Sequence, residues 1–75
     1  MLSLKSGNLF RHANETFIWV ESQDTWRPVS PNELFIFCSV TNKHQGVYQI
    51  SCLCTKTLAE CFTKFINVET LIKVK

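Results

Sequence analysis

Runs of apolar residues alternate along the chain with short polar segments, and most of the apolar side chains are β-branched or aromatic. The runs cover residues 8–12, 17–20, 34–40, 47–54 and 70–74. Val, Ile, Phe, Tyr and Thr fit a pleated strand better than a helix, so each run predicts a β-strand. We therefore expect a mostly β protein that forms a single small domain over residues 1–75.

The two strongest predicted strands, residues 34–40 and 47–54, flank a polar segment. This segment, residues 41–46, ends in Gly46 and predicts a hairpin loop. Side chains two positions apart share one face of a strand. The second strand should therefore direct Tyr48, Ile50, Cys52 and Cys54 to one side, and Gln49 and Ser51 to the other.

Two other segments give weaker signals. Residues 22–33 contain Pro28 and Pro31, and proline cannot donate a hydrogen bond within a sheet, so this segment predicts a loop. In residues 57–65 the apolar positions have helical spacing. These positions are Leu58, Cys61, Phe62 and Phe65. We expect a short helix there, and an irregular strand is the alternative because Thr, Phe and Ile favour β structure.

The order of these segments resembles that of a Src-homology-3-like barrel, of the kind found in short bacteriophage proteins. The similarity lies in a strand led by glycine (residues 5–10), the long loop at 22–33, the central hairpin of residues 33–37 and 46–50, and the closing strand at 69–74. It implies a small antiparallel barrel of five strands. The alternative is an α+β fold, with a helix at 57–65 packed on a curved antiparallel sheet. Polyproline binding does not carry over, because Trp19 and Trp26 are not adjacent.

Charge and composition narrow the classes of partner. The 75 residues carry a net charge of +2, and the basic residues are scattered rather than clustered. Such a mild charge predicts neither a nucleic acid nor a membrane surface as the partner. The longest apolar run, residues 34–38, is far shorter than the roughly 20 residues of a membrane-spanning helix. No secretory signal is recognisable, so we expect a cytoplasmic protein with free thiols, in the host cytoplasm if the protein is viral.

Four cysteines raise the question of metal binding and catalysis. Cys52 and Cys54 would point the same way from a strand, and His44 is a conceivable third ligand of zinc. Buried packing of free cysteines is the favoured interpretation, and a zinc-stabilised mini-domain is the alternative. No nucleophile signature, carboxylate pair or phosphate-binding glycine loop is recognisable. We therefore expect a protein that is not an enzyme and needs no cofactor.

Residue types that are enriched at protein interfaces point to protein binding. They are Trp26, Arg27 and Tyr48. Trp26 either projects from its loop as an anchor or folds back to plug one end of the barrel, whereas Trp19 is expected in the core. The alternative is a nucleic-acid-binding barrel that uses Arg11, Trp26 and Arg27.

An excess of apolar residues indicates a covered outer face. Residues 17–20 and 34–40 are apolar on both sides of their strands, yet one small barrel has a single interior. A helix at 57–65 could cover part of this outer apolar face, and a partner must cover the rest. The partner would be a second copy in a homodimer or a docked protein. The leading hypothesis is a non-enzymatic protein-interaction module. The resemblance suggests a phage-encoded binder that modifies a host protein.

Overall fold

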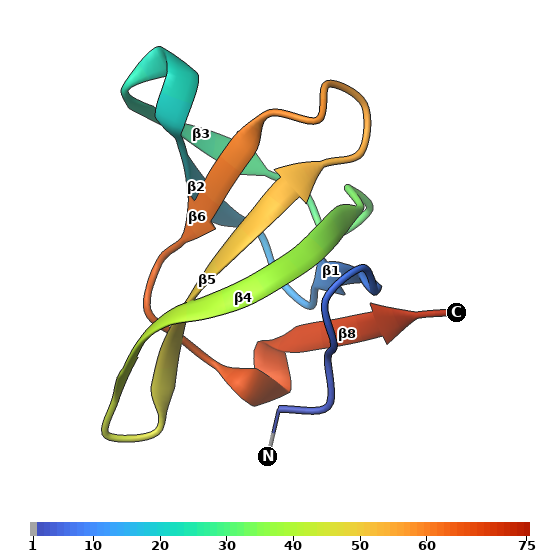
Figure 1. The fold of residues 1–75 in the computed structure, drawn as a ribbon, viewed down its shortest axis with the longest axis vertical. Coiled ribbons are helices and arrows are strands. Elements are labelled where there is room, and N and C mark those ends of the chain that lie inside the picture. Colours follow the sequence, from blue (N-terminus) through green and yellow to red (C-terminus); the bar gives the residue numbers. More distant parts are fainter. Residues whose placement is uncertain (1) are drawn as a thin grey trace.

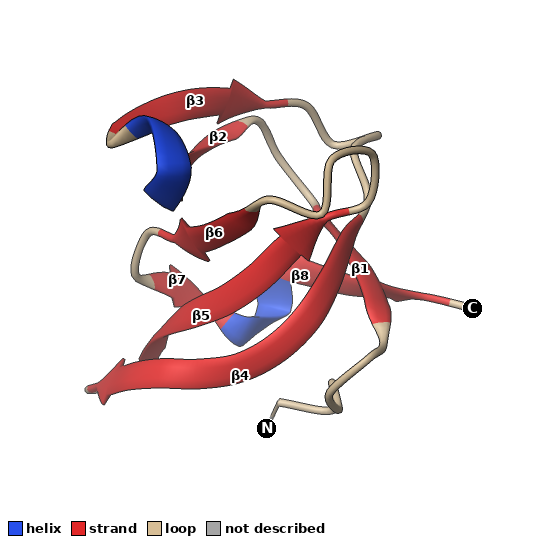
Figure 2. Ribbon diagram, turned by 45° about the horizontal axis from the view of Figure 1, so that its top comes forward, coloured by secondary structure: helices blue, strands red, loops and turns tan. Residues whose placement is uncertain are grey.

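The structure, a computed structural model, describes residues 2–75 and is built from β-strands and turns (Figures 1 and 2). No α-helix occurs in this part of the chain, and the eight strands are joined by turns and two short 3₁₀ segments. The strands are β1 (Leu9–His12), β2 (Thr16–Val20), β3 (Thr25–Val29), β4 (Phe35–His44), β5 (Val47–Cys54), β6 (Glu60–Thr63), β7 (Ile66–Asn67) and β8 (Leu71–Val74), and the 3₁₀ segments are η1 (Glu21–Gln23) and η2 (Val68–Thr70).

All the strands belong to one antiparallel sheet that curls into a half-barrel. Its order is β3-β2-β6-β5-β4-β1-β8, and β7 pairs with β5 beside this path. Figure 1 shows the long β4–β5 hairpin crossing the middle of the molecule, with β2, β3 and β6 on one side and β1 and β8 on the other. The mostly β prediction is confirmed. The count of five strands is wrong, and so is the α+β alternative, since eight strands and no α-helix are present in residues 2–75.

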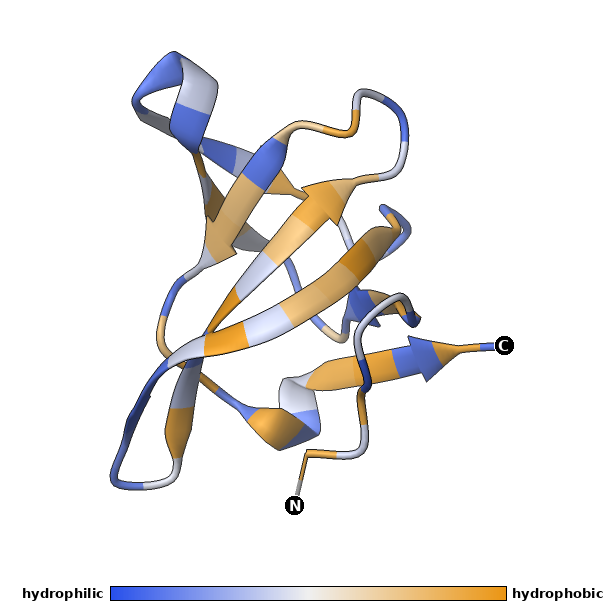
Figure 3. Cartoon of the chain, in the orientation of Figure 1, coloured by the Kyte–Doolittle hydropathy of each residue, from blue (hydrophilic) through white to orange (hydrophobic). Residues whose placement is uncertain are grey.

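The central hairpin is confirmed, but its loop is much shorter than expected. Strand β4 continues through the polar residues 41–44, and a two-residue turn of Gln45 and Gly46 leads into β5. Both turn residues have positive φ, 47° and 85°, as a type I′ turn requires. Pairing with β5 holds these polar residues in a strand whose hydrophilic end projects from the sheet (Figure 3).

The loop predicted at residues 22–33 contains a strand, so that prediction is wrong for part of the segment. The chain reverses its direction at η1, and β3 then runs antiparallel to β2. In this pairing Phe17 lies opposite Pro28, and Trp19 lies opposite Trp26. Proline is tolerated because β3 lies at the edge of the sheet, where a missing N–H costs no interstrand hydrogen bond. The proline argument excluded a central strand correctly, but it did not exclude an edge strand.

The predicted helix at residues 57–65 is also wrong, and the alternative of a strand is confirmed. A tight turn closes between Cys54 and Ala59, whose backbone groups hydrogen-bond to each other. Strand β6 then pairs with both β2 and β5. Within β6, Cys61 is buried and Phe62 lies on the opposite face, so the helical spacing had no structural meaning.

Leu58 occupies a backbone conformation that suits glycine. Its φ is 56°, in the left-handed region, and 62% of its side chain is exposed. That conformation costs a residue with a Cβ about 1–2 kcal/mol. We expect Leu58→Gly to raise the free energy of unfolding by about 0.5–1 kcal/mol, since the greater freedom of unfolded glycine offsets part of the gain. Urea denaturation measures this. Leu58→Ala, which keeps the Cβ, should give no gain, and an equal gain from both variants would contradict the argument.

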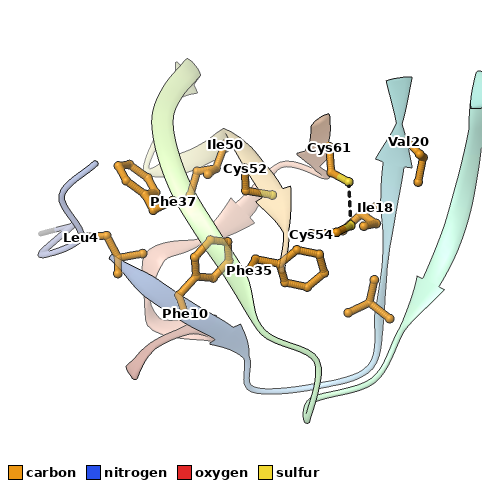
Figure 4. Close-up of a cluster of buried hydrophobic side chains, with 11 residues drawn as sticks. Leu4, Phe10, Ile18, Val20, Phe35, Phe37, Ile50, Cys52, Cys54 and Cys61 are labelled. Carbon is orange, nitrogen blue, oxygen red and sulfur yellow. Dashed lines mark hydrogen bonds between the residues drawn. The ribbon is translucent and has the colours of Figure 1, made fainter. Parts of the chain in front are cut away.

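Side chains on the inner side of the curl form one hydrophobic core (Figure 4). The buried members are Leu4, Phe10, Ile18, Val20, Val29, Phe35, Phe37, Ile50, Cys52, Cys54 and Cys61. The shared face predicted for β5 is confirmed, because Ile50, Cys52 and Cys54 are all buried. Trp19 is not in this core, so the expectation for that residue is wrong.

The residues described include no helix that is long and apolar enough to cross a membrane.

Candidate interaction surface

The three residues predicted to bind a protein do not share one surface. Trp26 and Arg27 are neighbours in β3, and successive side chains of a strand point to opposite faces. Trp26 is on the outer face with 46% of its surface exposed, whereas Arg27 pairs with buried Ile18 on the inner side. Tyr48 packs against the core, with Lys43 Nζ 5.5 Å from its ring centre. Of the three, only Trp26 therefore projects from the outer face, and the idea that it folds back to plug the barrel is wrong.

Trp26 has aromatic neighbours that the sequence places far from it. In the strand register Trp26 lies opposite Trp19, and Trp19 lies opposite Phe62 of β6. The two tryptophan rings meet edge to face, with their centres 5.5 Å apart and their planes at 72°. This geometry is favourable for aromatic pairs. The outer side of the sheet thus carries a row of three aromatic side chains across three adjacent strands.

A second outward pair extends the row. Phe17 lies opposite Pro28, one step along the same face, and the residue is 48% exposed. We call the five residues of this surface the aromatic face: Phe17, Trp19, Trp26, Pro28 and Phe62. No other segment of residues 2–75 is paired along the outer edge of β3, so the face continues to the edge of the sheet.

A shallow groove of about 420 Å³ borders the aromatic face. Its aromatic side is formed by Trp19, Trp26 and Phe62, and its polar side by Thr41, Asn42 and Gln49. Internal hydrogen bonds fix the polar side. Asn42 Nδ2 donates to Gln49 Oε1 at 2.6 Å, and Thr41 Oγ1 donates to the Gln49 carbonyl at 3.1 Å. The groove therefore offers apolar contact on one wall and oriented amide groups on the other.

Acidic residues lie at one end of the aromatic face. Glu21 accepts a hydrogen bond from Trp19 Nε1 at 3.0 Å and lines the groove. Glu60 is exposed on the same face of β6 as Phe62, and Asp24 is exposed in the turn before β3. Lys64, beyond the other end of β6, lies near Phe17 and Pro28. The acidic end disfavours a phosphate backbone and favours a partner with basic groups.

The arginines of the nucleic-acid alternative are not grouped around Trp26. Arg11 is on β1, which four strands separate from β3 in the sheet. Arg27 points to the other side, where its guanidinium forms a two-pronged ion pair with Glu33, at 3.0 and 2.6 Å. The hydrogen bond with Glu33 raises the pKa of Arg27 further above its ordinary value. A groove that joins stacking rings to these cations is therefore not formed.

The ligands of the zinc alternative are likewise separated. Cys52 and Cys54 pair with Phe37 and Phe35, whereas His44 lies at the opposite end of β4, next to the turn. Within residues 2–75 no three His, Cys, Asp or Glu side chains gather in a way that would hold a metal ion. The structure therefore does not bring Cys52, Cys54 and His44 together.

The edge of the sheet beside the aromatic face is poorly suited to adding a strand. Pro28 has no N–H, and the carbonyls of Trp26 and Pro28 accept long contacts from Thr25 Oγ1 at 3.4 Å and Arg27 Nη1 at 3.5 Å. An extended peptide beside β3 would therefore lack backbone hydrogen-bonding partners at these two residues. Recognition at this surface would therefore use the side chains of the face rather than the backbone of the edge.

Sequence reasoning found one member of the aromatic face and missed its companions. The sequence predicts Trp19 in the core and Phe62 on a helix, and it indicates an apolar outer face at residues 17–20 without showing which residues adjoin it. One signal was present, because residues 17–20 are apolar on both faces and so must place Phe17 and Trp19 opposite Ile18 and Val20. Trp26, Pro28 and Phe62 join these two residues because β2 pairs with β3 and β6, and the sequence alone does not reveal this pairing.

Comparison of the chain with protein-family models, with curated proteins and with solved structures found no match.

Proposed function

We propose that this protein is a non-enzymatic interaction module that binds a partner protein through the aromatic face. The observation that supports this is the row formed by Trp26, Trp19 and Phe62 on the outer side of the sheet. Tryptophan is the residue type most enriched among those that dominate binding energy at interfaces. An exposed tryptophan held against a second ring also loses little conformational freedom on binding, which favours affinity.

The charge around the face indicates the chemistry of the partner. Glu21, Asp24 and Glu60 would meet basic side chains that flank an apolar or aromatic anchor seated in the groove. A single-stranded nucleic acid also stacks on aromatic side chains, but these carboxylates would repel its phosphates. The proposal therefore favours a protein over a nucleic acid, as did the mild and scattered positive charge of the sequence. A phage-encoded binder of a host protein remains the setting that the barrel resemblance suggests.

The homodimer expected from the apolar excess is one form of the same proposal. Phe17, Trp26 and Val40 are exposed apolar side chains that a second copy would cover. A two-fold axis along the aromatic face would place two copies of Glu21 and Glu60 near each other, whereas an axis across it would bring them near Lys64 of the second copy. The charges therefore fit either a different protein or a second copy, and the test below distinguishes the two.

The test uses a random peptide library displayed against the folded full chain. We expect enriched peptides to combine an aromatic or proline anchor with flanking Lys or Arg. Loss of a central tryptophan typically costs 2 kcal/mol or more, so Trp26→Ala should weaken binding of a selected peptide by about 30-fold or more in calorimetry. The matched control is Phe65→Ala, since Phe65 is 51% exposed but does not line the groove. Its affinity should stay within about twofold of the unmodified protein.

Other outcomes would redirect the proposal. Tight binding of a single-stranded oligonucleotide at low salt, lost in Trp26→Ala and falling steeply as salt is added, would replace the protein partner with a nucleic acid. A dimer in sedimentation equilibrium that Trp26→Ala converts to a monomer would make a second copy the partner. Equal peptide binding by Trp26→Ala and Phe65→Ala would contradict the assignment of the aromatic face.

A further inference from the structure

Two buried cysteines face each other on the side of the sheet opposite the aromatic face. Cys54 Sγ at the end of β5 lies 3.1 Å from Cys61 Sγ in β6 (Figure 4). A disulfide bond has a length of about 2 Å, so the sulfurs would need to approach by about 1 Å to form one. The tight turn between Cys54 and Ala59 and the pairing of β5 with β6 already hold the two side chains together. Little chain entropy is therefore lost when the two sulfurs join.

A fixed positive charge distinguishes the two sulfurs. Arg27 Nη2 lies 3.4 Å from Cys54 Sγ, and its ion pair with Glu33 holds the guanidinium in this position. The charge therefore lies where a sulfur that acts as a nucleophile carries negative charge. Burial, together with the hydrogen bond between the two thiols, raises the pKa of the Cys61 thiol to about 12. Of the two sulfurs, Cys54 is therefore the one placed next to the positive charge for the first attack, and Cys61 is placed to attack second.

A cavity of about 600 Å³ gives access to Cys54. Besides Cys54, it is lined by Arg27, Glu33, Lys56 and Asn32, so both signs of charge and an amide surround the opening. Neither Cys52 nor Cys61 lines this cavity. A small molecule that carries carboxylates matches this lining, because Lys56 lines the cavity and takes no part in the ion pair between Arg27 and Glu33.

We propose that Cys54 and Cys61 form a redox-active dithiol that a small, carboxylate-bearing disulfide oxidises through this cavity. In the first step the Cys54 thiolate attacks one sulfur of the small disulfide. A mixed disulfide forms, and the other half leaves as a thiolate that takes up the proton lost by Cys54. In the second step Cys61 gives up its proton and its sulfur attacks Cys54 Sγ. The Cys54–Cys61 bond forms, the mixed disulfide breaks, and the second small thiolate takes up the proton that Cys61 lost. Two protein thiols are oxidised to one disulfide, and one small disulfide is reduced to two thiols.

The test exposes the reduced full chain to buffers of glutathione and glutathione disulfide, the probe for this class of oxidant. Samples are blocked with N-ethylmaleimide and analysed by intact mass and peptide mapping. A Cys38→Ser background removes the cysteine that is partly exposed and outside the pair. We expect an intramolecular Cys54–Cys61 disulfide in this background. Cys61→Ser should stop at a mixed disulfide on Cys54, and Cys54→Ser should leave Cys61 reduced.

The role of the Arg27 charge is tested by the rate at which the mixed disulfide forms on Cys54. Arg27→Met keeps much of the side-chain volume and removes the charge next to Cys54, so the first step should slow by about tenfold or more. Circular dichroism checks that each variant is folded, and peptide mapping of the Cys38→Ser protein decides the proposal without the other variants. A mapped bond between Cys52 and Cys61, a mixed disulfide that persists on Cys54 when Cys61 is present, or protein that stays reduced in glutathione disulfide would each overturn it.

Discussion

Replacing Phe35 with alanine is expected to leave a large fraction of the protein unfolded at 25 °C. The Phe35 residue is fully buried. The centre of its ring lies 5.8 Å from that of Phe10 and 5.6 Å from that of His12, both of which belong to β1. Truncation of a buried phenylalanine to alanine costs about 3–5 kcal/mol. A core of this size typically supplies only about 3–5 kcal/mol of net stability. The expected loss is therefore as large as the whole stability.

Urea denaturation followed by circular dichroism measures this effect. The control is Phe65→Ala, which removes the same side chain from a half-exposed position and should change the free energy of unfolding by about 0.5 kcal/mol or less. If Phe35→Ala lost less than about 1 kcal/mol, the core would be able to collapse around the missing ring, and its packing would contribute much less than its burial indicates.

Mild acid is expected to destabilise the protein through one side chain, His12. This residue is 2% exposed, its ring packs against Phe10 and Phe35, and neither ring nitrogen has a hydrogen-bond partner among the described residues. Burial lowers the pKa of His12, and the nearby charge of Glu33 opposes this only in part. The unfolded chain therefore binds a proton at this residue more readily than the folded chain does.

The pH range follows from the direction of this shift. Unfolded His12 takes up its proton as the pH falls through about 6.5, while folded His12 stays neutral until a lower pH is reached. Stability should therefore fall as the pH drops through about 6.5, by at most about 2 kcal/mol at pH 5, the limit for a folded His12 that stays neutral. His12→Leu should remove this loss and, because an unsatisfied buried polar group is eliminated, raise stability at pH 7.5 by about 1 kcal/mol.

Urea denaturation at a series of pH values between 5 and 7.5 provides the measurement. His44→Gln is the matched control, because His44 is exposed at the end of β4 and its replacement should leave the pH profile unchanged. A profile that stays the same in His12→Leu, or that disappears in His44→Gln, would show that His12 is not the group responsible.

The sequence predicted those strands in which local preference and tertiary structure agree. Residues 17–20 and 47–54 form strands because they are rich in β-branched and aromatic side chains, and because alternate side chains along each segment lie in the core. The closing strand at 70–74 was found for the same reason, one residue longer than β8. By contrast, β3 was missed because Pro28 is unfavourable within a sheet in general, and only the edge position makes it acceptable. That position is a property of the assembled sheet.

The misassigned helix at 57–65 shows a different limit. Leu58, Cys61, Phe62 and Phe65 have helical spacing, yet the first is an exposed turn residue, the second is buried and the other two face outward or lie beyond the strand. Short apolar patterns fit more than one periodicity, and pairing with β2 and β5 decided this one. The candidate site had the same limit, since Trp26 was recognised by type whereas Trp19 and Phe62 join it only through the strand register.

The strand order also determines at which stage of folding the aromatic face becomes complete. Trp19 and Trp26 belong to strands joined by a short turn, so their contact can form early and locally. Phe62 reaches them only when β6 inserts between β2 and β5, which closes a long loop of chain. Such non-local pairing is slow compared with hairpin formation. A nascent or partly folded chain would therefore expose tryptophans without a complete groove, and a partner that needs all three rings would select the finished molecule.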